Sequence, residues 1–381
     1  MTAATPTTVG LHDTVLDAIE SRTPLRISGR SHWIDAGRPV AATRIASTAA
    51  HAGIVDYVPG DLTITVKSGT TLREIAQVTR AEGQWLPIDP YGTPDGTIGA
   101  TIATGSFGPL AHGFGRTRDL VLGLEFITGE GKIVRGGGRV VKNVAGFDLV
   151  RLLTGSWGTL GIITEATLRL YSHPSRPMTV AMTAPAGAEA LSQRIKTVLS
   201  APVTPLAIEL ISGAVSDLLG FPPQQAILIE LGGNDAAISA QLDTLSRLGG
   251  LSNAPAGVWE KLRMMEDATH SSPSIVLRLS SLPERLGELW TGLSQVTAEA
   301  GALMHATPGL GIVRCILPPN TNAELLRTLA SANGITVIYE RLPAGMWNEL
   351  SPSVVSDRIS RGIMSAFDPH GILNPGILGV A

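Results

Sequence analysis

Backbone amides exposed by glycines are the groups whose type and spacing point most clearly to chemistry in this sequence. Glycines recur at dense, irregular intervals over residues 92–161, among them Gly99, Gly105, Gly108, Gly158 and Gly161. Because glycine has no side chain, its N–H can approach an anion closely and its backbone can adopt a positive φ. Loops of this kind can hold a diphosphate without a lysine. The same spacing also suits tight turns in a loop-rich domain, so the glycines alone leave both interpretations open.

Several other nucleotide-binding and catalytic patterns are missing from the sequence. No Gly-x-Gly-x-x-Gly turn follows an expected strand, which argues against an NAD-binding fold, and Gly131-Lys132 is followed by Ile133 rather than by Ser or Thr. The surroundings of Ser31 and Ser156 each lack one glycine of a nucleophile elbow. The eight histidines are scattered, with no pair at the spacing of metal ligands on a helix. We therefore expect no metal site and assign no catalytic residue.

Composition and charge narrow the class of protein further. The 381 residues include 29 Lys and Arg against 32 Asp and Glu, and only 4 % aromatic residues. The resulting net charge of −3 and the scarcity of aromatic rings argue against a nucleic-acid partner. A single cysteine, Cys315, excludes an internal disulfide and an iron–sulfur cluster held by this chain alone. Without a secretory signal or an apolar stretch of about 18 residues, a cytoplasmic enzyme or enzyme subunit is expected.

The helices and strands expected around these glycines predict an α+β fold. They divide the chain into three regions. The proline-bounded segment 172–177 separates a glycine-rich region, residues 1–173, from a region of ordinary helix and strand periods, residues 174–352. Residues 62–67 alternate as in a half-buried strand, and Thr71 with Glu74 predicts a capping box at the start of a helix. Residues 353–381 are expected to form a helix, from about Ser353 to Phe367, followed by a tail.

Four segments carry a family resemblance, in matching order and spacing. They are Leu25 to Pro39 (LRISGRSHWIDAGRP), Thr97 to Gly105 continuing to Arg118-Asp119, Gly138 to Leu170 (GRVVKNVAGFDLVRLLTGSWGTLGIITEATLRL) and Phe367 to Gly376 (FDPHGILNPG). The sequence thereby resembles the vanillyl-alcohol-oxidase (PCMH-type) flavoproteins. The resemblance implies a two-part FAD-binding domain and an α/β cap domain with a mainly antiparallel sheet. It also implies that the C-terminal tail returns to the FAD-binding domain.

Within that family the likeness is strongest to the FAD-binding accessory subunits of bacterial glycolate oxidases. The spacing from Gly29 to Gly37-Arg38-Pro39 and the stretch from Lys142 to Leu149 carry it. Such a subunit works beside a second flavoprotein subunit and an iron–sulfur subunit, acts in the oxidation of a small 2-hydroxy acid, and meets the membrane only peripherally, if at all, through its partners. The lone Cys315 agrees with a cluster on another chain. Residues 174–352 would then serve as a cap for substrate or subunit contact.

The resemblance also implies which residues hold FAD. The diphosphate would lie along Ser28, Gly29, Arg30, Ser31, His32 and Trp33. The opposite wall would be Thr97, Ile98, Gly99, Ala100, Thr104, Gly105, Ser106 and Gly108, with Arg118 close to it. The ribityl or adenine end would face Gly158, Gly161, Ile162 and Ile163, and Asn374 would lie near the isoalloxazine ring. Ile162 and Ile163 fit plain strand core equally well, and Lys142 with Asp148 fits a surface ion pair.

Some positions depart from the family pattern. Arg30 and Ser31 stand where doubled glycines are common, and Ala100 replaces the second glycine of a pair. His32 falls where certain relatives carry a histidine joined to the flavin, but the accessory subunits have none there, so non-covalent FAD is expected. Relatives that oxidise D-2-hydroxy acids carry clustered histidines with an acidic residue, whereas His305 has neither close by in sequence. A hydroxy-acid site would need residues from elsewhere in the chain.

Three hypotheses follow from these observations. The first is a FAD-binding subunit of a glycolate-oxidase-type dehydrogenase, passing electrons toward an iron–sulfur subunit. The second is a self-sufficient FAD-dependent oxidoreductase acting on a small alcohol or 2-hydroxy acid. The third is a flavin-less structural subunit of such a complex. The first accounts for the glycines, for the single cysteine and for the lone His305 together.

Overall fold

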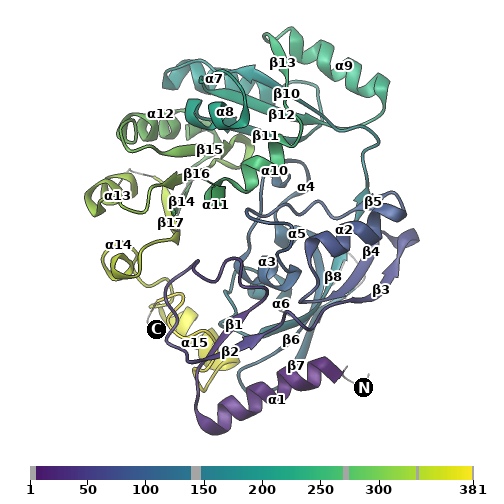
Figure 1. Ribbon diagram of the computed structural model, residues 1–381, viewed down its shortest axis with the longest axis vertical. Coiled ribbons are helices and arrows are strands. Elements are labelled where there is room, and N and C mark those ends of the chain that lie inside the picture. The colour runs from purple at the N-terminus through teal and green to yellow at the C-terminus, as the bar shows by residue number, and fades with distance from the viewer. Residues whose placement is uncertain (1–5, 139–146, 269–273, 332–333, 380–381) are drawn as a thin grey trace. The chain divides into compact units, whose positions relative to one another are not determined.

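The chain forms two units in the computed structural model, which describes residues 6–138, 147–268, 274–331 and 334–379 (Figure 1). The first unit comprises Met1–Gly108, Gly115–His173 and Pro352–Ala381, and the second comprises Pro109–Phe114 and Pro174–Ser351. Both combine helices with sheets, and the sheet of the second unit is antiparallel throughout. The predicted fold class is confirmed.

The described residues of the first unit form three small sheets. The largest has the strand order β3-β4-β8-β6-β7, while β1 pairs with β2 in parallel and β5 pairs with β9. The strands are β1 (Leu25–Ser28), β2 (Arg44–Ser47), β3 (Ile54–Val58), β4 (Thr63–Lys67), β5 (Gln84–Trp85), β6 (Val121–Ile127), β7 (Ile133–Gly137), β8 (Ile162–Arg169) and β9 (Tyr171–Ser172). The helices are α1 (Pro6–Ser21), α2 (Leu72–Ala81), α3 (Ile98–Thr104), α5 (Thr117–Leu120), α6 (Leu149–Leu153) and α15 (Arg358–Phe367).

Local sequence signals account for helix α2. Thr71 Oγ1 accepts a hydrogen bond from the N–H of Glu74 (3.1 Å), and the Glu74 carboxylate accepts one from the N–H of Thr71 (2.7 Å). These two bonds satisfy amides that the first helical turn leaves unpaired. The predicted capping box is confirmed.

The C-terminal segment packs on the first unit. Leu373 pairs with Leu25 of β1 in a parallel bridge, and the N–H of Leu25 donates to the carbonyl of Ile372 (2.7 Å). The predicted start of the last helix at Ser353 is wrong. Helix α15 begins at Arg358 because Asp357 caps it, accepting hydrogen bonds from the amides of Ile359 (2.9 Å) and Ser360 (3.0 Å).

The second unit is built on one sheet of described residues with the order β13-β10-β12-β11-β15-β16-β14-β17. Its strands are β10 (Met178–Thr183), β11 (Pro205–Ile211), β12 (Ala226–Leu231), β13 (Leu251–Asn253), β14 (Ile275–Ser280), β15 (Leu303–Thr307), β16 (Ile312–Leu317) and β17 (Thr336–Arg341). Its helices are α4 (Ala111–Phe114), α7 (Ala188–Leu199), α8 (Gly213–Leu219), α9 (Asp235–Ser246), α10 (Val258–Arg263), α11 (Met265–Ala268), α12 (Leu286–Val296), α13 (Ala323–Ala330) and α14 (Trp347–Leu350).

Helices cover both faces of this sheet. One face packs against α7, α12 and α13, and the other packs against α8 and α10 (Figure 1). Trp290 of α12 is 1 % exposed, and its indole N–H donates to Gln225 Oε1 (3.0 Å). Burying such a ring contributes about 1.5–3 kcal/mol or more to the stability of the unit. No helix among the described residues is long and apolar enough to cross a bilayer.

Candidate functional site

The loop after β1 offers consecutive backbone amides. Within the described part of the chain, the N–H groups of residues 29–32 donate no hydrogen bond to protein. Ser31 has a φ of 63°, which turns the backbone at the middle of this run. Successive amides in such a turn form a concave site for an anion. Arg30, Ser31 and His32 are exposed, so their side chains leave the backbone of the loop accessible.

The N-terminus of α3 lies directly against this loop. A Cβ on Gly29 would lie 2.3 Å from Thr97 Oγ1, so the two predicted walls meet at this point. Thr97 caps α3, and the amides of Ile98 and Gly99 donate to the carbonyls of Thr70 and Ser68, each at 2.9 Å. Because these two amides already donate to protein carbonyls, the N-terminal end of α3 offers a ligand its shape and its hydroxyl groups, but not these N–H donors.

The end of α3 is held mainly by packing. Gly105 terminates the helix with a φ of 63°, and a Cβ on Gly108 would lie 2.0 Å from the Asp89 carbonyl. Ser106 accepts at its carbonyl a hydrogen bond from Thr117 Oγ1 (2.5 Å), which ties this segment to α5. Arg118 on α5 is half-exposed and lies 3.8 Å from Asp119. The Thr104 hydroxyl donates back to the Ala100 carbonyl (2.8 Å).

Asn374 and the turn at residues 156–158 complete the cluster. The amide of Asn374 accepts a hydrogen bond from the N–H of Ile27 (2.8 Å) and donates one to the carbonyl of Trp157 (2.7 Å). The N–H of Trp157 donates to Ala103 of α3 (2.7 Å), and a Cβ on Gly158 would lie 2.9 Å from Asn374 Nδ2. The structure therefore brings together the loop after β1, α3, this turn and the C-terminal tail.

Three predicted residues lie in the sheet core instead. A Cβ on Gly161 would lie 2.6 Å from the Phe126 ring, so this glycine permits close packing. Ile162 pairs with Ile127 and is fully buried, and Ile163 is nearly so. Protein already covers both isoleucine side chains, which fits the alternative that they are strand core, and their apolar contact with FAD stays a prediction.

The residues present fit a ligand that carries phosphate and hydroxyl groups. Besides the amides of residues 29–32, the buried hydroxyls of Ser68 and Ser156 find no hydrogen-bond partner among the described residues. Ser68 lies against Gly99, and Ser156 precedes the turn that Asn374 contacts. Buried polar groups are normally paired, so these hydroxyls indicate capacity for a bound ligand. Sequence reasoning missed both serines because no local pattern distinguishes them.

Lys142, proposed to pair with Asp148, lies outside the described residues.

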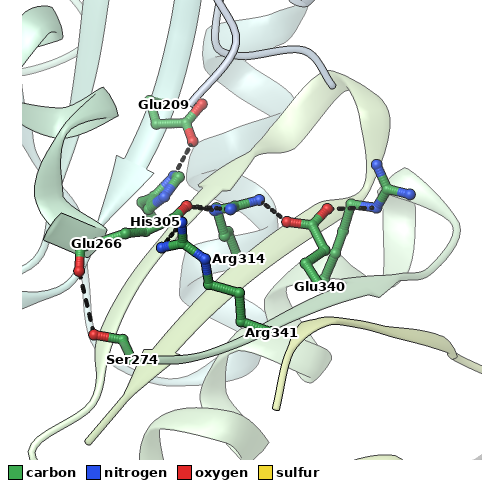
Figure 2. A network of polar contacts seen from close by, with 8 residues as sticks. Glu209, Glu266, Ser274, His305, Arg314, Glu340 and Arg341 are labelled. Atoms are coloured by element: carbon green, nitrogen blue, oxygen red, sulfur yellow. Dashed lines mark hydrogen bonds and ion pairs between the residues drawn. The ribbon is translucent and has the colours of Figure 1, made fainter. Parts of the chain in front are cut away.

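A second polar cluster crosses the sheet of the second unit (Figure 2). Arg314 on β16 pairs with Glu266 and with Glu340, and Arg341 lies 3.3 Å from Glu266. We call the following residues the sheet network: Glu209, Glu266, Ser274, Arg278, His305, Thr307, Arg314, Glu340 and Arg341. Among the described residues, no three His, Cys, Asp or Glu side chains are grouped so as to hold a metal ion.

His305 acquires its acidic partner from another strand. Its Nδ1 lies 2.6 Å from Glu209 Oε1, and the Thr307 hydroxyl donates to Glu209 Oε2 (3.0 Å). Both side chains of the pair are fully buried. Burial raises the pKa of Glu209 to about 8 and lowers the pKa of His305 to about 3. Both shifts favour a proton on the Glu209 carboxyl, which then donates to the neutral imidazole, and the His305 side chain is 1 % exposed.

This pair predicts a pH dependence of stability. Glu209 has a pKa of 4.5 in the unfolded chain and about 8 in the folded protein. Between these two pH values the folded state binds more protons at Glu209 than the unfolded state does, so the free energy of unfolding falls as pH rises. The lowered pKa of His305 gives the opposite slope between about pH 3 and its unfolded value of 6.5. The two slopes cancel between pH 4.5 and 6.5. From pH 6.5 to 8 only the Glu209 slope remains, about 2 kcal/mol in total.

Glu209→Gln is expected to remove that decline, because Gln keeps the hydrogen bonds without titrating. Urea unfolding of both proteins at pH 6.5, 7.2 and 8.0 measures the difference in slope. Parallel slopes for the wild type and the variant would show that Glu209 does not hold a proton in the folded state.

Comparison with known proteins decides the family. A family model described as "FAD binding domain" matches residues 4–137. The chain is 31 % identical over 374 residues to "Glycolate oxidase subunit GlcE" of Escherichia coli (strain K12), with 96 % of this chain and 95 % of that protein covered. The chain belongs to the PCMH-type FAD-binding flavoproteins. This flavoprotein is a FAD-dependent oxidoreductase, and the predicted family and cofactor are confirmed.

Two further comparisons agree. "Glycolate oxidase subunit GlcD" of Bacillus subtilis (strain 168) is 30 % identical over 360 residues, with 85 % of this chain and 76 % of that protein covered. The solved structure of p-cresol methylhydroxylase with substrate bound superposes with a TM-score of 0.74 at 15 % identity, covering 97 % of this chain and 87 % of that one. At such low identity the superposition shows the fold alone.

Proposed function

We propose that this flavoprotein is the FAD-binding subunit of a 2-hydroxy-acid dehydrogenase of the glycolate-oxidase type. It would work beside a second flavoprotein subunit and pass electrons toward an iron–sulfur subunit. Similarity to GlcE along nearly the whole of both chains is the observation that carries the proposal. A cytoplasmic location, with membrane contact only through partners, belongs to the same proposal.

The state of His305 supports a subunit role over independent turnover. Removing the hydroxyl proton of a 2-hydroxy acid needs a base within hydrogen-bond reach of the substrate. His305 is fully buried and holds a hydrogen bond to Glu209, so it cannot serve as that base. Oxidation of the acid to its 2-oxo product is therefore assigned to the partner flavoprotein.

In this proposal the task of the chain is to hold and tune a cofactor. When bound, FAD accepts two electrons as a hydride and can pass them on singly. The amides of residues 29–32 would neutralise the diphosphate, whose two charges need donors when removed from water. Thr97 and Gly29 set the separation of the two walls, while Ser68 and Ser156 would donate to ligand oxygen atoms. None of these residues would transfer a proton in this proposal.

Purification of the full chain, alone and co-expressed with the genes adjacent to its own, tests the proposal. We expect a flavin absorption spectrum, and release of the flavin into the supernatant after acid precipitation because attachment is non-covalent. The isolated chain should not be reduced by glycolate or D-lactate, whereas the co-purified complex should turn over glycolate.

Two results would overturn this proposal in different ways. Steady glycolate turnover by the isolated chain would make it a self-sufficient oxidoreductase. A spectrum without flavin bands that persists after reconstitution with FAD would make it a structural subunit.

A further inference from the structure

The C-terminal tail contacts both ends of the loop that carries the unbonded amides of residues 29–32. At the start of the loop, the Asn374 amide accepts from the N–H of Ile27, two residues before Gly29 (2.8 Å). At its far end, a Cβ on Gly37 would lie 3.1 Å from Ile377 Cγ1 and 2.9 Å from the Trp157 ring. Both ends of residues 28–37 are therefore fixed by contacts with the tail or with the turn that the tail holds.

Asn374 joins this loop to the opposite wall. Its Nδ2 donates to the Trp157 carbonyl (2.7 Å), and the N–H of Trp157 donates to Ala103 at the end of α3 (2.7 Å). One side chain thus links β1 to the turn that rests on α3. Without it, the described hydrogen bonds would leave the start of the loop attached to the tail only through the backbone pairing around Leu25.

The backbone of Asn374 indicates that the side chain is needed at this position. Its φ of 45° lies in the left-handed region, which favours glycine, and it is 3 % exposed. The adjoining tail is rigidly held: the Asp368 carboxylate accepts from the amides of Ile372 (3.2 Å) and Leu373 (2.8 Å). Asn374 is therefore buried, has a left-handed backbone conformation, and is hydrogen-bonded through both its side-chain oxygen and its side-chain nitrogen. A residue held in this way can orient the segments that it joins.

We propose that Asn374 is a positioning residue for FAD, and that docking of the tail and binding of FAD are thermodynamically linked. The inference rests on the FAD cofactor and on the placement of its diphosphate at residues 28–33. A tail that orders the loop lowers the cost of arranging its amides around an anion. By reciprocity, FAD must stabilise the docked tail by the same factor. This role is separate from any contact with the isoalloxazine ring, because it acts through the bonds of the Asn374 amide to Ile27 and Trp157.

Three variants separate this role from general stabilisation. Asn374→Gly keeps the left-handed backbone and removes both side-chain bonds. Asn374→Asp keeps the acceptor for Ile27 and places a carboxylate oxygen against the Trp157 carbonyl. Gln241→Ala is the matched control, because Gln241 is another buried amide that bonds two backbone groups, Thr204 N–H (3.0 Å) and Gly232 C=O (3.4 Å), but in the second unit.

We expect Asn374→Gly and Asn374→Asp each to raise the FAD dissociation constant about tenfold or more, measured by quenching of flavin fluorescence. Gln241→Ala should lower the melting temperature of the apoprotein without changing FAD affinity. In the wild-type chain, FAD should slow hydrogen exchange of the amides of residues 372–374 by a similar factor. This last measurement needs no variant, so it holds even where a substitution impairs folding.

The outcomes distinguish the linkage from the cofactor assignment. Equal FAD affinity in the wild type and Asn374→Gly, or tail exchange that FAD leaves unchanged, would overturn the linkage while leaving FAD binding intact. A wild-type chain that binds no FAD would overturn both.

Discussion

Gly29→Ala is expected to weaken FAD binding about a hundredfold. The new Cβ would lie 2.3 Å from Thr97 Oγ1, a separation that no real contact tolerates. Thr97 cannot turn away cheaply, because it is 1 % exposed and its hydroxyl accepts the N–H of Ala100 at the start of α3. The loop must therefore move, carrying the amides of residues 29–32 with it. Gly29 has no positive φ, so the effect is steric and not conformational.

The measurement is FAD affinity by fluorescence quenching, beside the melting temperature of each apoprotein. Gly60→Ala is the matched control, since a Cβ there meets nothing within 4 Å and its φ is not positive. Adding Thr97→Ala to Gly29→Ala removes the clashing oxygen and leaves the nearest remaining side-chain atom at 3.3 Å, so it should restore part of the affinity. Unchanged affinity in Gly29→Ala would place the diphosphate elsewhere.

The sequence is most informative where short-range signals act. Thr71 and Glu74 define the start of α2 because a capping box needs only residues three apart. The glycines around Gly29 and the tail motif indicate a FAD-binding fold because each lies within one short, continuous segment of sequence. Strand β15 is not predicted although Pro308-Gly309 marks a turn after it, since the strand LMHAT is buried on both faces and shows no alternation.

Contacts between residues that lie far apart in the sequence could not be predicted. Asn374 and Ile27 are 347 positions apart, and Glu209 and His305 are 96 apart, so no local pattern links either pair. The sequence showed only that His305 has no second histidine or carboxylate close by, and strand pairing supplies a carboxyl partner from elsewhere in the chain. Likewise, the sequence cannot show that the amides of Ile98 and Gly99 are occupied, because their acceptors, the carbonyls of Thr70 and Ser68, lie in a separate segment.

The sheet network gives the other large expected effect. Arg314 is 3 % exposed and bonds two carboxylates, Glu266 from α11 and Glu340 from β17. Burying ions costs several kcal/mol each, and only good geometry offsets that cost. The network is thus most sensitive to loss of its central cation, because the two carboxylates would remain buried.

Arg314→Met is expected to lower the free energy of unfolding by about 3–5 kcal/mol, since Met keeps the apolar stem and removes the charge. Urea unfolding followed by circular dichroism measures the change. Arg176→Met provides the control, because the Arg176–Asp235 pair is 73 % and 77 % exposed and its loss should cost less than about 1 kcal/mol. Equal effects of Arg314→Met and Arg176→Met would mean that water reaches the network and screens its charges.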